Sequence, residues 1–301
     1  MYPWIDLYFF KIPSFGLMVA TAFLVCNHLL KKEFPKHNLN PKIADDIIFY
    51  SIISAIIGSK LYHVIETGSF SDLFTNLKNI LISLFSFEFS NAINQLQFLG
   101  SGLVFNGGFI CALIFIAIYL RKNKINFLQI LDIVCPYILL GHGIGRIGCF
   151  LVGDDYGIPT NSFLGIAFPN GLPKTLISTF TENGQLYYLG YNAEQLKEFL
   201  VPGSAEIIKV HPTQIYEMTL YFLGFFLIRK VFNTTKLSLG LTSSIYLVYA
   251  GLSRFLVELI RTNERYMFNL SSAQYISLLL IFTGIIIYMN LNKINKSYGK
   301  Y

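Results

Sequence analysis

Long apolar stretches separated by short polar segments dominate the chain. Stretches such as 113–120 and 278–288 carry no charged residue, and several approach the roughly 20 residues that a bilayer-spanning helix needs. The candidate spans lie at about 14–31, 44–66, 102–121, 127–150, 212–232, 240–260 and 272–291. This pattern predicts an all-α polytopic membrane protein, with seven transmembrane helices in a single membrane domain that covers residues 1–301.

Basic residues gather at alternate ends of these spans, and their distribution predicts the orientation. One set of ends carries Lys31, Lys32, Lys36, Lys42, Arg121, Lys122, Lys124, Arg229, Lys230, Lys236, Lys293, Lys296 and Lys300. The opposite set carries fewer, spread over longer loops: Lys11, Lys78, Lys174, Lys197, Lys209, Arg261 and Arg265. Because cytoplasmic loops are enriched in Lys and Arg, we expect the amino terminus outside and the carboxyl terminus in the cytoplasm.

Two segments between the spans are expected to have other roles. The segment 151–211 falls on the outer side and contains AEQLKEFL, a short amphipathic helical pattern, so it is expected to form an extracytoplasmic cap. Residues 78–94 are apolar but short and irregular, which predicts an interfacial helix rather than an eighth span.

Composition narrows the class of protein further. Only 13% of the residues are charged, against about 25% in an ordinary soluble domain. The net charge of +6 comes from basic residues between apolar stretches, so nucleic-acid binding is not indicated. The cysteines form no CxxC or Cys/His spacing, so we expect no disulfide, no metal and no cofactor. The first twelve residues lack the basic start and cleavage site of a signal peptide.

Charged residues inside the predicted spans are costly and therefore mark candidate functional positions. Some are expected simply to reach the interface, because they lie close to the cytoplasmic ends of their spans: Asp45, Asp46 and Asp132. Arg146, Glu217 and Arg254 are not explained in this way, and they are candidate site residues.

The segment GHGIGRIGCFLVGDDYG contains the first of these. His142, Arg146 and Cys149 follow an i, i+4, i+7 spacing and share one helix face. A neighbouring stripe of small residues consists of Gly141, Gly145 and Gly148. Such a stripe lets a helix or a lipid headgroup approach the backbone, and the guanidinium offers two donors to a phosphate. The segment thus favours a phosphodiester lipid, with tight helix packing and a paired Arg146 as the alternative.

The sixth span, YAGLSRFLVELIR, places Arg254, Glu258 and Arg261 on one helix face, with Arg261 at the outer boundary. Two interpretations are open. Glu258 serves only to neutralise Arg254, or the two arginines face one outer cavity and neutralise a phosphate as it leaves.

The fifth span opens with HPTQIYE, so that Gln214, Glu217 and Tyr221 share a face and His211 lies at the outer interface. His211 either packs and caps there or takes part in proton transfer. Lys60, in the outer half of the second span, either adds a third cation to the site or extends its charge to the interface.

The segments FNGGFI, GRIGCFLVGDDYG, HPTQIYE and YAGLSRFLVELIR together resemble, in family order, the bacterial prolipoprotein diacylglyceryl transferases. The likeness runs from SFGLM to SSAQYISLLLIFTG, over nearly the whole chain. It implies an enzyme of the bacterial cytoplasmic (inner) membrane. Such an enzyme transfers the diacylglyceryl group of phosphatidylglycerol to the lipobox cysteine thiol of a prolipoprotein at the outer leaflet, forming a thioether. The implied partners are phosphatidylglycerol, the prolipoprotein lipobox segment and membrane lipid.

The resemblance also implies roles for individual residues. Arg146 and Arg254 match the arginines that the family uses on the lipid phosphate. Supporting motif positions are matched by Asp154, Gly157, Gln214, Glu217 and Glu258. The other residues expected to bind substrate are Gly107, Gly108, Cys149, His211, Arg261 and Lys60.

Three positions depart from the family pattern. Asn106 stands where many members have the histidine proposed as general base, Phe15 replaces a common tyrosine, and Cys149 replaces a common asparagine. An amide does not accept a thiol proton, so Asn106 and His142 are both candidate catalytic positions. Either His142 or His211 takes the proton, the thiol loses it by another route beside the arginines, or the protein binds lipid without this reaction.

Two other functions remain open at this point. In a transporter or lipid-binding membrane protein, the embedded arginines and glutamates would line a path or a pocket. A related transferase would use the same lipid with another thiol or an alcohol as acceptor.

Overall fold

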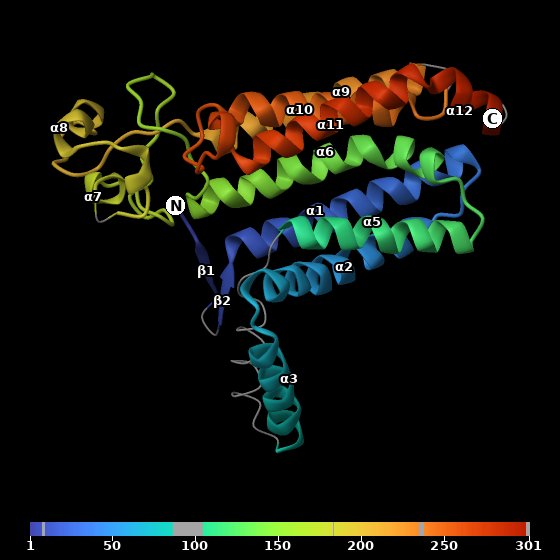
Figure 1. Ribbon diagram of the computed structural model, residues 1–301, viewed down its shortest axis with the longest axis horizontal. Coiled ribbons are helices and arrows are strands. Elements are labelled where there is room, and N and C mark those ends of the chain that lie inside the picture. Colours follow the sequence, from blue (N-terminus) through green and yellow to red (C-terminus); the bar gives the residue numbers. More distant parts are fainter. Residues whose placement is uncertain (8–9, 87–104, 183, 235–237, 299–301) are drawn as a thin grey trace. The chain divides into compact units, whose positions relative to one another are not determined.

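The computed structural model describes residues 1–7, 10–86, 105–182, 184–234 and 238–298, and most of them are helical (Figure 1). The predicted helical class is therefore confirmed. The chain divides into two compact units, one formed by Met1–Leu30 with Leu128–Tyr301 and the other by Lys31–Phe127. The single membrane domain expected from the sequence stays a prediction.

Long helices make up most of the first unit. They are α6 (Phe127–Val152), α9 (Thr213–Thr234), α10 (Leu241–Glu258), α11 (Ser272–Met289), the first part of α1 (Ser14–Glu33) and the shorter α12 (Leu291–Tyr298). Helix α10 packs against both α9 and α11. Helix α6 approaches α1 closely at Gly148, where an added Cβ would lie 3.1 Å from Phe15 and Met18. Part of the predicted glycine stripe therefore serves helix packing.

The segment between α6 and α9 folds around an apolar core of its own. Its short elements are α7 (Ile177–Phe180), η2 (Tyr187–Leu189), α8 (Ala193–Leu196) and η3 (Lys197–Phe199). Tyr156, Phe168 and Phe180 form the aromatic part of this core, and the rings of Tyr156 and Phe168 are stacked. The helix predicted for AEQLKEFL is shorter than expected, because α8 gives way to the 3-10 turn η3 after one turn.

A small β-hairpin precedes α1 and corrects the purely α-helical prediction. Strands β1 (Trp4–Leu7) and β2 (Phe10–Pro13) pair antiparallel, with Trp4 opposite Pro13. The backbone N–H of Tyr2 donates to the carbonyl of Leu151 at the end of α6, which holds the hairpin in place. The sequence pattern missed the hairpin because each strand has only four residues.

The second unit consists of η1 (Phe34–His37), α2 (Lys42–Thr67), α3 (Phe70–Phe85) and α5 (Phe105–Lys122). Helices α2 and α5 pack against each other at Gly58 and Gly107, where either residue would clash with the opposite backbone if it carried a Cβ. The interfacial helix predicted at 78–94 overlaps α3, and its residues 87–94 lie outside the described part of the chain.

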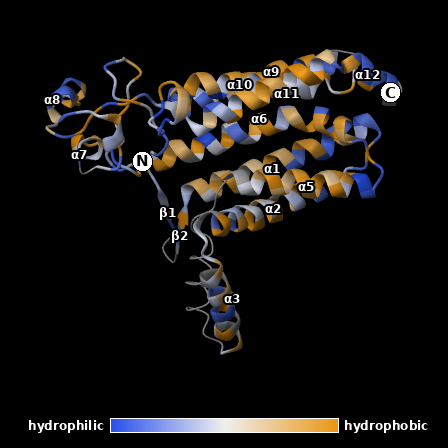
Figure 2. Ribbon diagram, in the orientation of Figure 1, coloured by the Kyte–Doolittle hydropathy of each residue, from blue (hydrophilic) through white to orange (hydrophobic). Residues whose placement is uncertain are grey.

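Among the described residues, the segments Ser14–His37, Lys42–Ile65, Phe127–Val152 and Ser272–Met289 are long and apolar enough to cross a membrane. Figure 2 shows hydrophobic residues in orange along the long helices and a hydrophilic α12 in blue. The protein is therefore a helical membrane protein. Helices α5, α9 and α10 coincide with the other predicted spans, and their crossing of the membrane stays a prediction.

Asp132 behaves differently from the sequence expectation. It does not extend to an interface, since only 3% of the residue is exposed. One carboxylate oxygen accepts from the backbone N–H of Gly240 (2.6 Å), and the other accepts from the N–H and the hydroxyl of Ser243 (2.7 Å each). Gly240 has no side chain to cap α10, so Asp132 satisfies the first N–H groups of that helix instead.

Candidate active site

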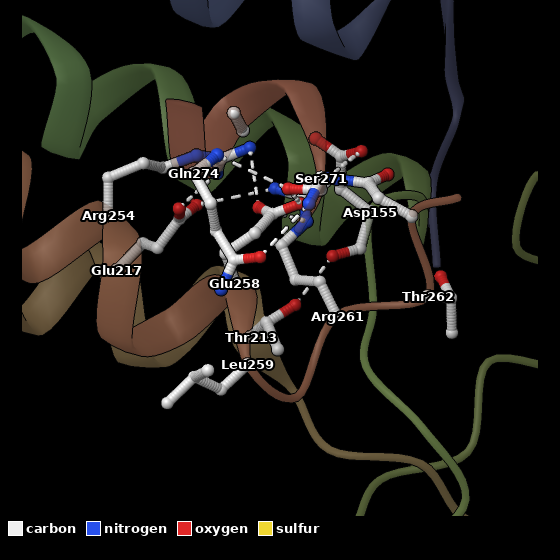
Figure 3. Close-up of polar contacts among 12 residues, drawn as sticks. Asp155, Thr213, Glu217, Arg254, Glu258, Leu259, Arg261, Thr262, Ser271 and Gln274 are labelled. Carbon is white, nitrogen blue, oxygen red and sulfur yellow. Dashed lines mark hydrogen bonds and ion pairs between the residues drawn. The ribbon is translucent and has the colours of Figure 1, made fainter. Parts of the chain in front are cut away.

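Arginines and carboxylates form a partly buried cluster in the first unit, where α6 and α10 end and α9 begins (Figure 3). Its members are Arg146, Asp155, Glu217, Arg254, Glu258 and Arg261. The structure thus brings together residues from the three segments that the sequence singled out separately. Asp155 was not among the predicted site residues.

Glu217, on the second turn of α9, lies at the centre of the cluster and is 1% exposed. One of its oxygens is 2.5 Å from Nε of Arg146 and 3.7 Å from Nη1 of Arg261. The other oxygen accepts a hydrogen bond from Nη1 of Arg254. Three guanidinium groups therefore converge on a single buried carboxylate.

Asp155 links two of the same arginines from the other side. Its Oδ2 accepts from Nη1 of Arg146 at 2.6 Å, and its Oδ1 accepts from Nη2 of Arg261. Burial raises the pKa of Asp155, but Arg261 and Arg146 more than offset burial and bring the pKa below its usual value. No sequence spacing relates Asp155 to Arg261, because 106 residues separate them.

Glu258, the last residue of α10, is the third carboxylate of the cluster. Its Oε2 is 3.1 Å from Nη2 of Arg254 and 3.7 Å from Nε of Arg261. Its Oε1 accepts from the hydroxyl of Ser271 at 2.9 Å and from Nδ2 of Asn263 at 2.5 Å. The predicted proximity of Arg254 and Glu258 is therefore confirmed.

Arg261 does not lie on the helix face predicted for it. Helix α10 ends at Glu258, so Arg261 lies beyond the helix rather than on its face. Its backbone pairs with that of Gly157, and its side chain turns inward and is buried. Tertiary pairing, not helical spacing, brings this arginine to the cluster.

The segment that follows α6 is held against the start of α9. The backbone N–H of Gly157 donates to the carbonyl of His211 at 2.8 Å, and an added Cβ at Gly157 would lie 2.9 Å from His211 and from Thr213. Thr213 donates to the carbonyl of Asp155 at 2.5 Å, and Gln214 donates to the carbonyl of Asp154. Only glycine fits at position 157, which explains its place in the motif.

Asp154 carries an unusual carboxyl group beside the cluster. Burial and the nearby Asp155 raise its pKa to about 6. Its Oδ1 is buried and has no hydrogen-bond partner among the described residues, and the same holds for Oε1 of Gln214 and Nε2 of Gln274. Buried polar atoms of this kind are uncommon in a closed structural network and are typical of a site that takes a polar ligand.

The remaining candidates on α6 and before α9 lie around this cluster. Cys149 is buried, and its sulfur is 3.4 Å from Nη1 of Arg146. His142 is exposed one turn before Arg146, and its ring centroid is 5.4 Å from that of Tyr221. Nδ1 of His211 lies 3.2 Å from the Tyr216 hydroxyl, and burial lowers the pKa of His211.

Cys149, Asp154 and Asp155 have potential metal-ligating atoms within 4.8 Å of one another. Arg146 already donates to both the Cys149 sulfur and Asp155, and Arg261 donates to the other Asp155 oxygen. Because both oxygens of Asp155 already accept from arginines, a metal ion would have to displace these two ion pairs.

The other predicted site residues belong to the second unit. Gly107 and Gly108 pack against α2, where an added Cβ at Gly108 would lie 2.6 Å from the Ser59 hydroxyl. Lys60 lies on α2. Asn106 is in the first turn of α5, and its side chain lies outside the described part of the structure.

The fold and the cluster together define a helical membrane protein with a buried arginine–carboxylate site. The family model described as prolipoprotein diacylglyceryl transferase matches residues 4–290, and the chain belongs to this family. It is 30% identical to the phosphatidylglycerol–prolipoprotein diacylglyceryl transferase of Clostridium tetani (strain Massachusetts / E88), over 97% of each chain.

Other relatives carry the same name. The phosphatidylglycerol–prolipoprotein diacylglyceryl transferase 2 of Clostridium perfringens (strain 13 / Type A) is 29% identical, over 96% of this chain and 94% of its own. The enzyme so named from Prochlorococcus marinus (strain MIT 9301) is 30% identical, over 94% and 89% respectively. The resemblance stated from the motifs is therefore confirmed.

Proposed function

We propose that this protein transfers the diacylglyceryl group of phosphatidylglycerol to the lipobox cysteine thiol of a prolipoprotein, as the first step of lipoprotein maturation. The observation that carries this proposal is the convergence of Arg146, Arg254 and Arg261 on Glu217. One guanidinium group donates two parallel hydrogen bonds to phosphate oxygens, and here three guanidinium groups lie in one cluster of a membrane protein. Family membership supplies the reaction.

In the proposed reaction, the thiolate attacks the glycerol carbon that bears the phosphate. A carbon–sulfur bond forms as the carbon–oxygen bond to phosphate breaks, and glycerol phosphate leaves with the electron pair. Arg146 and Arg254 stabilise the charge that develops on the leaving phosphate, which is the main electrostatic contribution to the rate. Glu217 and Glu258 position these two guanidinium groups through the ion pairs described above.

The thiol proton must go to a base. We propose His142 for this role, because it lies one helical turn before Arg146. His211 remains the second candidate, although its Nδ1 is already engaged with the Tyr216 hydroxyl.

The proposed membrane placement follows the positive-inside rule. Seven helices would cross the cytoplasmic membrane with the amino terminus outside, and the segment 151–211 would form an extracytoplasmic cap. Its separate apolar core supports this placement. The arginine cluster would then lie at the outer leaflet, where a prolipoprotein presents its lipobox.

The decisive experiment incubates the purified protein with phosphatidylglycerol micelles and a lipobox peptide. Mass spectrometry then looks for a diacylglyceryl adduct on the peptide cysteine. We expect the adduct with the natural chain, none with Arg146→Ala, and strongly reduced formation with Arg146→Lys, because a lysine cannot reproduce the paired donors.

Arg229→Ala is the matched control. Arg229 also lies on a long helix of the first unit, but it packs over the rings of Tyr137 and Phe225 instead of joining the cluster. Transfer should persist in this variant. A folded natural protein that binds the lipid and yields no adduct would refute the transferase and favour a transporter or a binding protein.

A further inference from the structure

The amino-terminal hairpin presents an aromatic face to its surroundings. Trp4 and Asp6 of β1 are exposed while Ile5 between them is partly buried, because successive side chains of a strand point to opposite sides. Tyr2, two residues before the strand, is exposed as well. Tyr2 is 70% exposed and Trp4 55% exposed. At the distal end, Asp6 pairs with Lys11 at 3.6 Å. The exposed face therefore changes from aromatic to charged along the hairpin.

The hairpin is anchored at the ends of two apolar helices that are long enough to cross a membrane. The N–H and the hydroxyl of Ser14, the first residue of α1, both donate to the carbonyl of Pro3, at 3.0 and 3.1 Å. Tyr2 is bonded to Leu151 at the end of α6, and Met1 packs against the core of the 153–211 segment. These bonds fix Tyr2 and Trp4 at one end of the first unit.

A second aromatic projection lies between α10 and α11. Tyr266, Met267 and Phe268 are all exposed, Phe268 by 84%. Phe268 and Asn269 have positive φ angles of 54° and 56°, a conformation that non-glycine residues adopt at a cost. The exposed side chains of this loop therefore lie on a backbone with two residues in the left-handed conformation.

The loop is held in that conformation by side chains from both sides. Arg265 donates to the carbonyl of Leu259 at 2.9 Å and to that of Asn269 at 3.2 Å. Tyr275, in the first turn of α11, donates to the carbonyl of Met267. Helix α11 is itself a candidate membrane span with exposed apolar residues, so the loop continues an apolar surface at its end.

Both projections lie at the same end of the first unit as the arginine–carboxylate cluster. The hairpin is bonded to the end of α6, which carries Arg146 and leads into Asp155. The loop is followed by Ser271, which donates to Glu258 of the cluster. Aromatic residues with a polar edge are enriched where membrane helices meet the headgroup layer, because that layer accommodates an apolar ring and a hydrogen-bonding group together.

We propose that the exposed side chains of Tyr2 and Trp4 and the loop 266–268 insert into the headgroup layer of a phospholipid bilayer. In this position they fix the depth of the arginine–carboxylate cluster relative to the lipid phosphates. The Asp6–Lys11 pair stays at the aqueous side of that layer. This inference does not depend on the transfer reaction, because it concerns only where one end of the first unit meets the lipid.

The chain offers a direct probe, because Trp4 is its only tryptophan. The full protein is reconstituted in vesicles of phosphatidylcholine and phosphatidylglycerol, with bromine atoms placed near either the carbonyl end or the methyl end of the acyl chains. We expect Trp4 emission to be lost mainly to bromine near the carbonyl end, with little quenching by aqueous iodide.

Two variants in a Trp4→Phe background complete the experiment. With Phe268→Trp the same shallow quenching is expected. Glu194→Trp is the matched aqueous control, since Glu194 is an exposed charged residue of the 153–211 segment, and iodide should quench it. Iodide quenching of Trp4 or of the Phe268→Trp probe, without quenching by brominated lipid, would overturn the proposal. Protection of either probe from both quenchers would also overturn it and indicate a protein partner.

Discussion

The two ends of α6 hold buried polar groups of opposite character. Near its start, Asp132 uses both oxygens to accept three hydrogen bonds from Gly240 and Ser243. Near its end, Arg146 enters an ionic cluster beside which buried polar atoms of Asp154 and Gln214 have no partner among the described residues. The Asp132 carboxylate is satisfied within the fold, while the buried oxygens of Asp154 and Gln214 retain hydrogen-bonding capacity.

This difference distinguishes a polar group that only stabilises the fold from one that is a candidate for binding. A buried carboxylate that only stabilises a fold is fully paired, because each unpaired polar atom costs free energy. The sequence predicted that Asp132 reaches the interface and that Arg146 is a candidate site residue, but it gave hydrogen-bond partners for neither. The hydrogen-bond partners show that Asp132 caps α10, and the buried atoms without partners near Arg146 are consistent with the ligand site proposed there.

The largest expected effect comes from Glu217→Ala. Removing this carboxylate leaves Arg146, Arg254 and Arg261 without their common partner, and breaking a buried pair costs about 3–5 kcal/mol. We expect both the free energy of unfolding in detergent and the transfer activity to fall. In Glu217→Gln, which keeps the shape of the side chain without its charge, both quantities should fall by less. Unchanged stability in Glu217→Ala would show that the cluster is not held by Glu217.

The same test at the other end of α6 is Asp132→Ala. The loss of hydrogen bonds to a charged group should lower the free energy of unfolding by about 1.5–3 kcal/mol. Transfer by the folded fraction should not change, because Asp132 serves the start of α10. Thermal unfolding in micelles and the lipobox assay measure the two effects separately. If Asp132→Ala lost transfer activity but unfolded with the same free energy as the unmodified protein, the purely structural role of Asp132 would be contradicted.

A smaller effect is expected from Ser271→Ala. Ser271 caps α11 by accepting from the backbone of Gln274, and it donates to Glu258. Loss of the cap lowers stability by about 1 kcal/mol, while Asn263 and Arg254 still hold Glu258. Ser271→Thr should restore most of the stability in the same unfolding measurement. If it does not, the cap is not the source of the loss.

The smallest expected effect is a pH dependence of phosphatidylglycerol binding that comes from Asp154 and not from Asp155. With a pKa of about 6, Asp154 is protonated below that pH and ionised above it. The ionised form adds a negative charge near Arg146 and Arg261, so phosphatidylglycerol should bind more weakly as the pH rises through about 6. The change should be less than about fivefold, or about 1 kcal/mol.

Asp154→Asn isolates this contribution in the same binding titration. It should remove the Asp154 part of the pH dependence and keep the tighter binding at neutral pH. Any residual dependence then belongs to the histidines. If the Asp154→Asn variant keeps the full pH dependence of the unmodified protein, the whole dependence comes from the histidines and not from Asp154. Asp155 does not titrate in this range, since its arginine partners keep its pKa below the usual value.

Much of this protein follows from its sequence alone. Apolar periodicity and length predict the long helices, because a membrane helix satisfies its own backbone and must be apolar over about 20 residues. Residue chemistry then selects Arg146, Glu217 and Arg254, since a charge inside a span needs a reason. The motifs that contain them were sufficient to indicate the family.

Tertiary structure decided the rest. Asp155 joins Arg261 across 106 residues, and Asp132 caps α10 by binding Gly240, 108 residues later. The hairpin is held by a hydrogen bond to the end of α6. Helical spacing relates only residues within a few turns, so it cannot predict partners on different elements. The sequence therefore determined which charged side chains are costly to place inside a span. Only the folded chain determined which buried polar groups find all their hydrogen-bond partners and which do not.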